Sequence, residues 1–367
     1  MTIRLAQNND KLNIRKLWKL GFGDSDEFLD FYFSDYYDPQ SALITTKAGE
    51  ITASLQTVPS TLIYGGNELP AAYIVGVVTH PEHRMRGYAG ELIKAIIADL
   101  NHSGVLVSAL IPGEPHLFSI YQKYGFANVF SICEKDITPN DLQSADSRGK
   151  LHTKRYGRED LQPGRIETEA LYEFYTEAYK RAGFCLLKSK ETFLLYIREF
   201  LSFQGEICVI FKGDDLAACA FLVNRGELSF VKEFLCANES CGNFLLEEIM
   251  NTIGQDKITI RTVPSDNNFK SFGMARALNV QGLLRVLTKG KKMSFTIKVA
   301  DPIILENNGI FTVNNNIVNI DTKTIQPDLN LTITEFTELA FKYGFDIEAF
   351  ETKEVKSRGY INLMLNS

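Results

Sequence analysis

The residues best suited to chemistry lie in VVTHPEHRMRGYAGELIKAIIADL, residues 77–100. The apolar run at 71–79 predicts a strand that is buried on both faces, and His80-Pro81 ends it. Beyond this point apolar residues recur with helical spacing, at Ala89, Leu92, Ile93, Ile96, Ile97 and Leu100. The pattern therefore predicts a helix that begins near Arg86-Gly87, inside a basic loop.

A helix that starts in this way can bind an anion. Its first backbone N–H groups have no partner within the helix and together carry about half a positive charge, and a glycine lets a ligand approach the backbone closely. The two standard nucleotide loops are missing from the sequence. There is no GxxxxGK[ST] motif, and Gly21-Phe22-Gly23 lacks both a third glycine and a preceding strand.

The hexapeptide Arg84-Met85-Arg86-Gly87-Tyr88-Ala89 resembles the R/Q-x-x-G-x-G/A loop of the GCN5-related N-acetyltransferases (GNAT), with Ala89 in place of the last glycine. In that family the loop holds the pyrophosphate of acetyl-CoA, and the pantetheine arm pairs with the end of the preceding strand. The resemblance therefore implies acetyl-CoA as co-substrate. It assigns cofactor contacts to Val77, Val78, Thr79, Arg84, Met85, Arg86, Gly87, Tyr88, Ala89 and Gly90.

A second signal follows at the spacing that such a fold requires. Residues 105–111 predict another buried strand, and FSIYQKYGF at 118–126 resembles the family's helix that ends in Gly-Phe. By this resemblance Tyr121 is the general acid that protonates the departing CoA thiolate, and a backbone N–H near Val78 holds the carbonyl oxygen. A tyrosine with a reference pKa of about 10 is neutral at physiological pH and can donate that proton.

Simpler interpretations exist for each of these residues. Tyr121 could pack in a core, and Arg84 and Arg86 could be solvated surface charges, but the combined pattern favours a functional site. His80 and His83 have an HxxH spacing, yet no third ligand follows at the spacing of a zinc site. We therefore expect no metal.

The composition is typical of a globular enzyme with several domains, since the chain has 367 residues, of which 45% are hydrophobic and 23% charged. A net charge of −6 argues against a nucleic acid or an anionic membrane as partner. The N-terminus lacks an apolar signal segment, and no run reaches about 18 apolar residues. Six dispersed cysteines indicate reduced thiols, so we expect a cytoplasmic protein.

The chain divides into four expected segments. Residues 1–137 form the catalytic GNAT domain, and the polar stretch 138–164 is a linker that could add a strand or helix. Residues 165–290 repeat the order of elements, with a helix around 171–179, strands at 206–211, 216–223, 228–233 and 257–263, and a helix at 243–253. Only Phe234–Glu239 precedes that last helix, without a basic glycine loop. A degenerate second GNAT-like domain is therefore expected.

The fourth segment, 291–367, has a different pattern. Strands at 293–299, 310–313 and 317–320 predict an antiparallel meander, and a helix follows that Thr334 could cap and Gly344 could end. A meander and helix after tandem acetyltransferase-like domains resembles the sterol-carrier-like C-terminal domain of Eis-type (enhanced intracellular survival) acetyltransferases. The end of the second repeat, Phe272–Arg276, resembles the corresponding point of these tandem proteins. Its simpler interpretation is a turn followed by a helix start.

The expected fold class is therefore mixed α/β (α+β), with two tandem GNAT-like acyl-CoA N-acyltransferase domains and a small α+β sterol-carrier-like domain. In the Eis-type family the C-terminal carboxylate enters the active site, which gives Ser367 a role as base or as anchor for the acceptor amine. Holding an ammonium group is the easier role, because a free C-terminal carboxylate has a reference pKa of about 3.3–3.7.

The acceptor pocket is expected near GDSDEF, residues 23–28, where Asp26 is our choice for a contact with the amine. Asp26 could instead serve only the first turn of a helix that Asp24 or Ser25 caps. This part of the prediction depends on one carboxylate.

The sequence thus predicts an acetyl-CoA-dependent N-acetyltransferase that passes acetyl directly to an amine of an unidentified small-molecule or peptide acceptor. The resemblance also implies a homo-oligomer. Two alternatives stay open. A non-catalytic CoA-binding or assembly protein would keep the loop without turnover, and a tRNA-dependent aminoacyl transferase would need a long basic surface.

Overall fold

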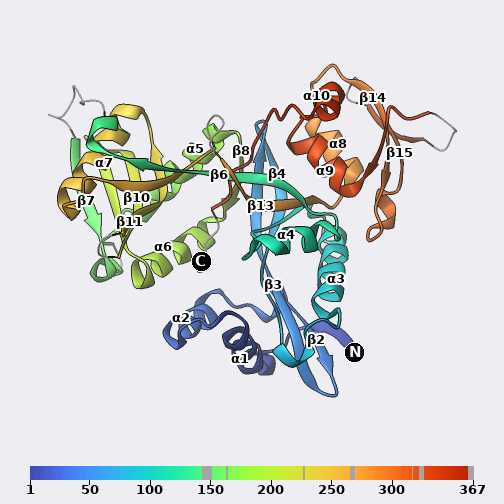
Figure 1. Cartoon of the computed structure of the whole chain (residues 1–367), viewed down its shortest axis with the longest axis horizontal. Helices are drawn as coiled ribbons and strands as arrows, with labels where there is room; N and C mark the ends of the chain where they lie inside the picture. The colour runs from blue at the N-terminus through green and yellow to red at the C-terminus, as the bar shows by residue number, and fades with distance from the viewer. Residues whose placement is uncertain are drawn as a thin grey trace. The chain divides into compact units, whose positions relative to one another are not determined.

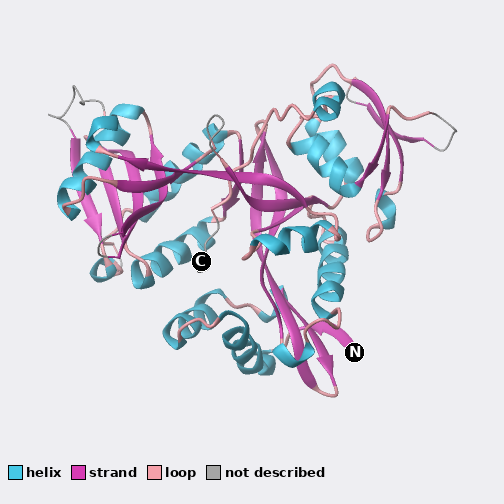
Figure 2. Cartoon of the chain, viewed as in Figure 1, coloured by secondary structure: helices cyan, strands magenta, loops and turns pink. Residues whose placement is uncertain are grey.

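The computed structural model describes residues 1–142, 151–162, 164–225, 228–264, 269–315, 317–321 and 326–362. It divides into two compact units, each containing strands and flanking helices (Figure 2). The first unit contains Met1–Phe130 and Ser271–Gly359, and the second contains Ser131–Lys270 and the segment that begins at Tyr360. The first unit thus contains most of the expected first and last segments.

The first unit is built on a mixed sheet in the order β1-β2-β3-β4-β5-β13. Its strands are β1 (Thr2–Leu5), β2 (Ala42–Lys47), β3 (Glu50–Tyr64), β4 (Asn67–Thr79), β5 (Val107–Leu110) and β13 (Lys270–Ala277). Neighbouring strands are antiparallel except β4 and β5, which run parallel. The alternative of a turn and helix start at Phe272–Arg276 was wrong, because these residues lie in β13, paired with β5.

Helices cover both faces of this sheet (Figure 1). They are α1 (Lys11–Phe22), α2 (Asp26–Phe31), α3 (Tyr88–His102) and α4 (Pro115–Gln122), and a π-helical turn at Tyr32–Tyr36 follows α2. α3 packs its apolar stripe, from Leu92 to Leu100, against Leu55 and Ile74 of the sheet. The predicted helix start near Arg86-Gly87 is confirmed, since Gly87 is the N-cap residue.

A small four-stranded sheet in the order β16-β15-β14-β17 completes the first unit. Its strands are β14 (Ser294–Ala300), β15 (Gly309–Asn314), β16 (Ile317–Asp321) and β17 (Leu329–Thr332), with helices α8 (Val280–Leu287), α9 (Ile333–Phe341) and α10 (Ile347–Thr352) on one side (Figure 1). The antiparallel meander is confirmed. The cap was wrong by two residues: Thr332 accepts from Glu335 N–H, whereas Thr334 lies inside α9.

A buried ion pair lies where this small domain meets the catalytic sheet. The side chains of Arg276 on β13 and Asp301 are both 0% exposed and are joined by two hydrogen bonds of 2.7 and 2.8 Å. Arg276 also donates to the carbonyl of Tyr124 at 2.7 Å, just beyond α4. Gly125 has φ 88°, and a side chain on it would meet Ile333 and Arg276 within 3 Å. The turn after α4 is therefore fixed by the small domain.

The second unit repeats the plan of the first. Its sheet has the order β6-β12-β11-β10-β9-β7, formed by β6 (Ala127–Ile137), β7 (Leu151–Tyr156), β9 (Glu206–Lys212), β10 (Asp215–Arg225), β11 (Leu228–Cys236) and β12 (Ile258–Thr262). The remaining elements are α5 (Thr168–Ala182), β8 (Phe184–Lys188), α6 (Lys190–Phe203) and α7 (Glu239–Ile253). β11, α7 and β12 form a parallel β-α-β crossover, as β4, α3 and β5 do.

Part of the expected linker 138–164 belongs to this sheet, because β7 pairs with β9. Residues 143–150 and 163 of that segment lie outside the described residues. Within the described parts of the chain, no helix is long and apolar enough to cross a membrane.

The Arg276–Asp301 pair can be tested by substitution. Arg276→Met leaves the Asp301 carboxylate buried without its partner, and we expect a loss of about 3–5 kcal/mol in the free energy of unfolding of the first unit. Lys94→Met is the matched control, because it breaks an exposed pair with Glu91 worth no more than about 1 kcal/mol. Urea unfolding monitored by fluorescence measures the free energy of unfolding of both variants. Equal losses would show that the buried pair contributes no more to stability than the exposed one.

Candidate functional site

Strands β4 and β5 separate after a short paired stretch. They pair only at Ala71–Tyr73 with Val107–Ala109, and β4 then continues to Thr79. The other edge of β4 stays paired with β3 as far as Thr79. Backbone groups on the β5 side of residues 74–79 are therefore open to a ligand that pairs like a strand.

A β-bulge lies within this open stretch of β4. Ser54 of β3 is opposite Val78 and Gln56 is opposite Val75, so Leu55 alone faces both Gly76 and Val77. Gly76 has φ 63°, and a Cβ atom there would lie 2.3 Å from the Trp18 ring of α1. The bulge thus requires glycine for its backbone angle and for the approach of α1. Sequence analysis missed this feature, although a lone glycine in an apolar strand is a known signal for one.

The loop from Arg84 to Gly90, called the anion loop below, joins the end of β4 to α3. Met85 and Gly87 both have positive φ, 61° and 83°. The first helical hydrogen bond joins Glu91 N–H to Gly87 O at 3.1 Å, and no described side chain caps the helix. Arg84 and Arg86 are exposed. Free N–H groups and a helix dipole therefore occur beside two exposed arginines of the same loop, a combination that suits a pyrophosphate.

The predicted cofactor residues occupy different environments. The side chain of Met85 is fully exposed, and that of Tyr88 is buried in the core beneath α3. Gly90 is buried, and a Cβ atom there would lie 2.1 Å from the Tyr124 hydroxyl. Tyr88 and Gly90 can therefore bind a ligand through their backbone N–H groups. Both residues also matter for packing, because the ring of Tyr88 is in the core and Gly90 leaves space for Tyr124. Val77 and Thr79 are half-buried at the end of β4, beside buried Val78.

Tyr121 lies on α4 within the core cluster that also includes Ile74 and Leu110. It is 9% exposed, and burial raises the pKa of its phenol to about 12. Tyr73, at the last paired position of β4, is close enough to interact electrostatically with Tyr121, and burial raises the pKa of Tyr73 well above its usual value. Two neutral phenols thus lie near the point where β4 and β5 separate. No sequence motif pointed to Tyr73.

Asp26 is the first residue of α2, and Ser25 caps that helix through Phe28 N–H at 3.2 Å. The Asp26 carboxylate pairs with Lys19 and also with Arg15 at 3.1 Å, both from α1. Hydrogen bonds from Lys19 and Arg15 lower the pKa of Asp26. An acceptor amine would have to compete with two cations for this group. Ser367 lies outside the described residues.

The second unit has the strand geometry of the first without its anion loop. β11 and β12 pair only at Phe230–Val231, and a cavity of about 570 Å³ opens beyond, lined by Phe234, Cys236 and the first turns of α7. Asn238 caps α7 by accepting from Cys241 N–H at 3.0 Å, and Glu239 adds a negative charge in the first turn. The helix start is therefore satisfied internally and repels anions.

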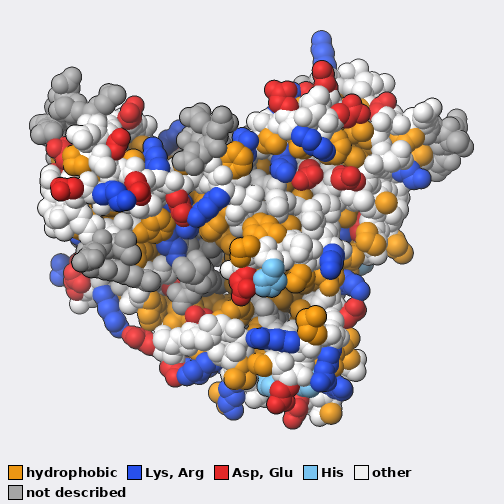
Figure 3. Space-filling view, viewed as in Figure 1, with side chains coloured by type: hydrophobic (Ala, Val, Ile, Leu, Met, Phe, Trp, Pro, Cys, Tyr) orange, Lys and Arg blue, Asp and Glu red, His pale blue; other side chains and the backbone are white. Residues whose placement is uncertain are grey.

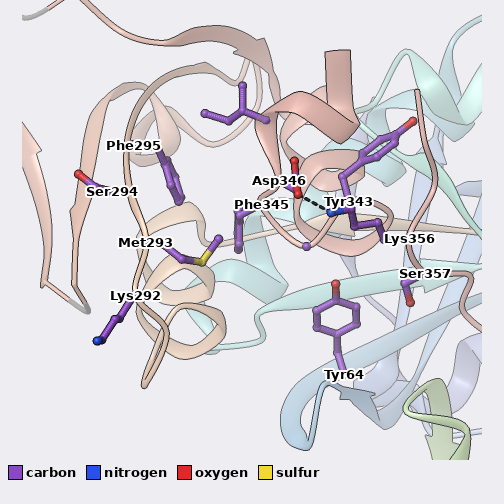
Figure 4. A pocket seen from close by; sticks show the side chains of 12 residues that line it. Tyr64, Lys292, Met293, Ser294, Phe295, Tyr343, Phe345, Asp346, Lys356 and Ser357 are labelled. Atoms are coloured by element: carbon purple, nitrogen blue, oxygen red, sulfur yellow. Dashed lines mark hydrogen bonds and ion pairs between the residues drawn. The ribbon is translucent and has the colours of Figure 1, made fainter. Parts of the chain in front are cut away.

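Another cavity of about 570 Å³ lies in the small domain (Figure 4). Phe295, Phe345 and Met293 line one side, and Tyr64 of β3 contributes from the catalytic sheet. Lys356 and Asp346 form an ion pair at its rim (Figure 4). Phe345 has φ 65°, which is rare for an aromatic residue, and its ring stacks on Phe295 at 5.7 Å.

Comparison with known proteins agrees with this geometry. Residues 2–129 match the family "Acetyltransferase (GNAT) domain", and residues 275–358 match the family "Sterol carrier protein domain". No protein of curated function matches the sequence significantly.

Solved structures that share the fold include three that cover nearly the whole chain. Eis1 from Mycobacterium abscessus is 14% identical, covering 93% of this chain and 90% of its own, with a TM-score of 0.72. A probable N-acyltransferase from Enterococcus faecalis V583 is 16% identical, with the same two coverages and a TM-score of 0.77. A GCN5-related N-acetyltransferase from Anabaena variabilis ATCC 29413 is 18% identical, covering 97% and 94%, with a TM-score of 0.76.

With its uncapped start of α3 and the separated strands beside it, the region of residues 2–129 is a GNAT acetyltransferase domain. More particularly, the chain has the fold of the Eis-like proteins, with a sterol carrier protein domain after tandem GNAT-like folds. Acetyltransferase function and the expected fold class are confirmed.

The bulge at Gly76 gives a prediction with an internal control. Gly76→Ala adds a clash with Trp18 to the strain of a positive φ, whereas Gly49→Ala adds a comparable strain, at φ 87°, with open space around it. We expect Gly49→Ala to cost about 1–2 kcal/mol and Gly76→Ala at least 1 kcal/mol more. Thermal unfolding with and without acetyl-CoA measures both. If the two variants unfold at the same temperature, the contact between α1 and the bulge does not contribute to stability.

Proposed function

We propose that the first domain binds acetyl-CoA at the anion loop and transfers acetyl directly to an amine of a small molecule or peptide. The observation that carries this proposal is the uncapped start of α3, with Arg84 and Arg86 beside it, at the end of a strand whose β5-facing edge is open. Acetyl-CoA, when bound, supplies an activated thioester. The remaining steps belong to the chain's own residues.

The loop residues hold the co-substrate through charge and backbone donors. N–H groups from Gly87 to Gly90 and the guanidinium groups of Arg84 and Arg86 bind the phosphates. The open edge of Val77–Thr79 pairs with the amide groups of the pantetheine arm. A backbone N–H near Val78, at the bulge, is the proposed donor to the acetyl oxygen.

Turnover with a panel of amines tests the function itself. Purified protein is mixed with acetyl-CoA and polyamines, aminoglycosides or a peptide with a free N-terminus, and CoA release is followed with a thiol reagent. Arg84→Gln with Arg86→Gln should weaken acetyl-CoA binding about 10–100-fold through lost charge-assisted hydrogen bonds. Thermal shift by acetyl-CoA with no CoA release from any amine would favour a non-catalytic CoA-binding or assembly protein.

Tyr121 is the proposed acid. Its buried phenol keeps its proton at physiological pH, and as the carbon–sulfur bond breaks it donates first a hydrogen bond and then the proton to the sulfur. A pKa of about 12 makes it a weaker acid than free tyrosine. Proton transfer should therefore accompany the development of charge on sulfur and not precede it.

Tyr121→Phe should lower kcat about 100-fold and leave acetyl-CoA affinity nearly unchanged. The matched control is Tyr124→Phe, three residues further along, which removes the hydroxyl that packs against Gly90. Because the pKa of Tyr121 is raised, its ionisation should cause no loss of kcat between about pH 7 and about pH 10. Equal kcat in wild-type and Tyr121→Phe protein would remove Tyr121 from the mechanism.

The acceptor amine must be held in place, and the proton that it loses on acylation returns through water to Tyr121, which has given its own proton to the sulfur. We assign the holding role to the carboxylate of Ser367, following the Eis-type resemblance, and retain Asp26 as a second, weaker contact. Asp26 is weaker because Lys19 and Arg15 already neutralise it.

Adding one glycine after Ser367 moves the terminal carboxylate by one residue, about 3.5 Å. We expect kcat/KM for the amine to fall at least about tenfold, with acetyl-CoA binding unchanged. Asp26→Asn serves as the comparison and should change kcat/KM less. Unchanged turnover in the extended chain would exclude the terminus from the mechanism.

For the second GNAT-like domain we propose a structural role without a CoA site, because Asn238 caps α7 and Glu239 places a negative charge there. We also propose a cytoplasmic homo-oligomer, which light scattering can measure. All six cysteines are free thiols, and five are buried, as suits a reducing compartment.

A tRNA substrate is disfavoured. On the face drawn in Figure 3, blue basic and red acidic side chains are interspersed, and the described residues there form no broad basic area. Absence of tRNA binding at low salt is the corresponding test.

A further inference from the structure

The cavity of the small domain lies far from the anion loop. Its volume is about 570 Å³, and it is lined by residues 292–295 and 343–347 together with Tyr64, Lys356 and Ser357 (Figure 4). Tyr64 is the last residue of β3 and pairs with Asn67, the first residue of β4. β4 has 13 residues, so at about 3.3 Å per residue its two ends are about 40 Å apart along the strand. The cavity is therefore distinct from the acetyl-CoA cleft.

The walls of this cavity are aromatic. The rings of Phe295 and Phe345 are stacked, with centroids 5.7 Å apart and planes 22° from parallel. Tyr343 and Tyr64 also line the cavity, and all four residues are buried. Aromatic rings offer flat, rigid contact area and pack well against another flat ring. The walls therefore favour an aromatic ligand over a flexible chain.

The backbone is strained where it presents one of these rings. Phe345 has φ 65° and follows Gly344 at φ 61°, so two successive residues are left-handed. For phenylalanine this conformation is unfavourable, and it persists only where the surrounding structure compensates for it. Phe345 N–H donates to Leu339 O at 2.9 Å, which joins the turn to α9. Strained residues of this kind cluster at ligand sites, and the ring of this one lines a cavity.

The apolar interior of the small domain is separate from the cavity. Ile297 and Phe311 of the small sheet and Phe336 and Leu339 of α9 are each no more than 1% exposed. These side chains fill the space between the sheet and its helices, so a long apolar chain would have to displace them. The cavity lies instead beside the turn between α9 and α10.

The lining of the cavity carries a net positive charge. Lys356 has one hydrogen-bond acceptor among the described residues, the Asp346 carboxylate, whereas an ammonium group has three donors. Asp346 is also engaged as the cap of α10, because it accepts from Ala349 N–H at 2.9 Å. Lys292 is exposed, and within the part of the chain that the structure describes it has no ion-pair partner. Two lysines and one carboxylate suit an anionic ligand.

We propose that this cavity binds a small organic anion with a flat aromatic body, of the class of the aryl carboxylates. The aromatic body packs against the stacked rings of Phe295 and Phe345, and the carboxylate accepts hydrogen bonds from Lys356 and Lys292. The inference depends neither on acetyl-CoA binding nor on turnover. The aryl site, as it is called below, consists of Tyr64, Lys292, Phe295, Tyr343, Phe345 and Lys356.

Calorimetric titration of the full chain with three probes tests the class of ligand. 2-Naphthoate is a flat aromatic anion, 2-naphthamide has the same rings without the charge, and hexadecanoate is a flexible anion. We expect 2-naphthoate to bind with a Kd of about 0.1 mM, and 2-naphthamide to bind about tenfold more weakly because it lacks the charge-assisted hydrogen bonds.

Three results with these probes would overturn the proposal. They are an absence of 2-naphthoate binding at millimolar concentration, equal affinities for 2-naphthoate and 2-naphthamide, and tighter binding of hexadecanoate than of 2-naphthoate.

Substitution of the two lysines locates the binding. Lys292→Met with Lys356→Met removes both positive charges of the aryl site and should weaken 2-naphthoate binding at least about tenfold. The matched control is Lys298→Met with Lys342→Met, which removes the same charge from the small domain at residues that do not line the cavity. In each pair one lysine forms an ion pair, Lys356 with Asp346 and Lys342 with Glu338. Equal losses of affinity in the two double variants would show that the probe binds elsewhere.

Phe345→Gly tests the aromatic wall. Glycine adopts φ 65° without strain, so this change removes the ring and keeps the conformation of the turn. We expect the affinity for 2-naphthoate to fall at least about tenfold. If this variant melts at too low a temperature for calorimetry, Phe345→Leu replaces it, since leucine keeps an apolar side chain and lacks the flat ring. Unchanged affinity in the folded variant would overturn the proposed packing of the ligand.

Acetyl-CoA distinguishes the aryl site from the proposed catalytic site. Because the two sites lie at opposite ends of β4, saturating acetyl-CoA should change the affinity for 2-naphthoate by less than about twofold. Displacement of 2-naphthoate by acetyl-CoA would place the probe in the acetyl-CoA cleft and overturn the inference. Protein that binds 2-naphthoate as expected but turns over no amine would refute the proposed function and support the aryl site.

Discussion

The ion pair between Arg276 and Asp301 is the constraint on which the catalytic domain depends. Two fully buried charges must stay together, because either one alone would be far more costly to bury than the pair. Arg276 also binds the carbonyl of Tyr124, so this pair fixes the end of α4 and, one turn earlier, Tyr121. The sterol carrier protein domain, which supplies Asp301, therefore helps to place the proposed acid although it is distant in sequence.

Each of the two α/β units contains a parallel β-α-β crossover, but the two helix starts differ in their capacity to bind an anion. In the first, Gly87 leaves the start of α3 uncapped, and two arginines make it attractive to phosphates. In the second, Asn238 caps α7 and Glu239 repels anions, while the separation of the two parallel strands remains. A change of a few residues at a helix start thus removes an anion site without changing the fold.

Much of the fold followed from sequence patterns. Continuous apolar runs predicted β4 and β5, and periodic apolar residues predicted α3, α5 and α9. Errors arose where local signals compete. Thr332 and Thr334 both lie near the start of the same helix, and the capping box with Glu335 shows that Thr332 is the cap. Phe272–Arg276 lacks alternation because successive residues from Gly273 on are buried on both faces of the sheet, so it was not recognised as a strand.

The sequence by itself determined the kind of chemistry. Residues 84–90 and Tyr121 lie in consecutive elements, a strand, a loop and two helices, and each of these elements has a local sequence pattern. Only the tertiary structure decided which groups act on them. The bulge at Gly76 depends on the approach of Trp18, and the neutralised state of Asp26 depends on Lys19 and Arg15 of another helix. The contact of Lys188 with Asn362 joins residues 174 positions apart, and no pattern of neighbouring residues encodes such a distance.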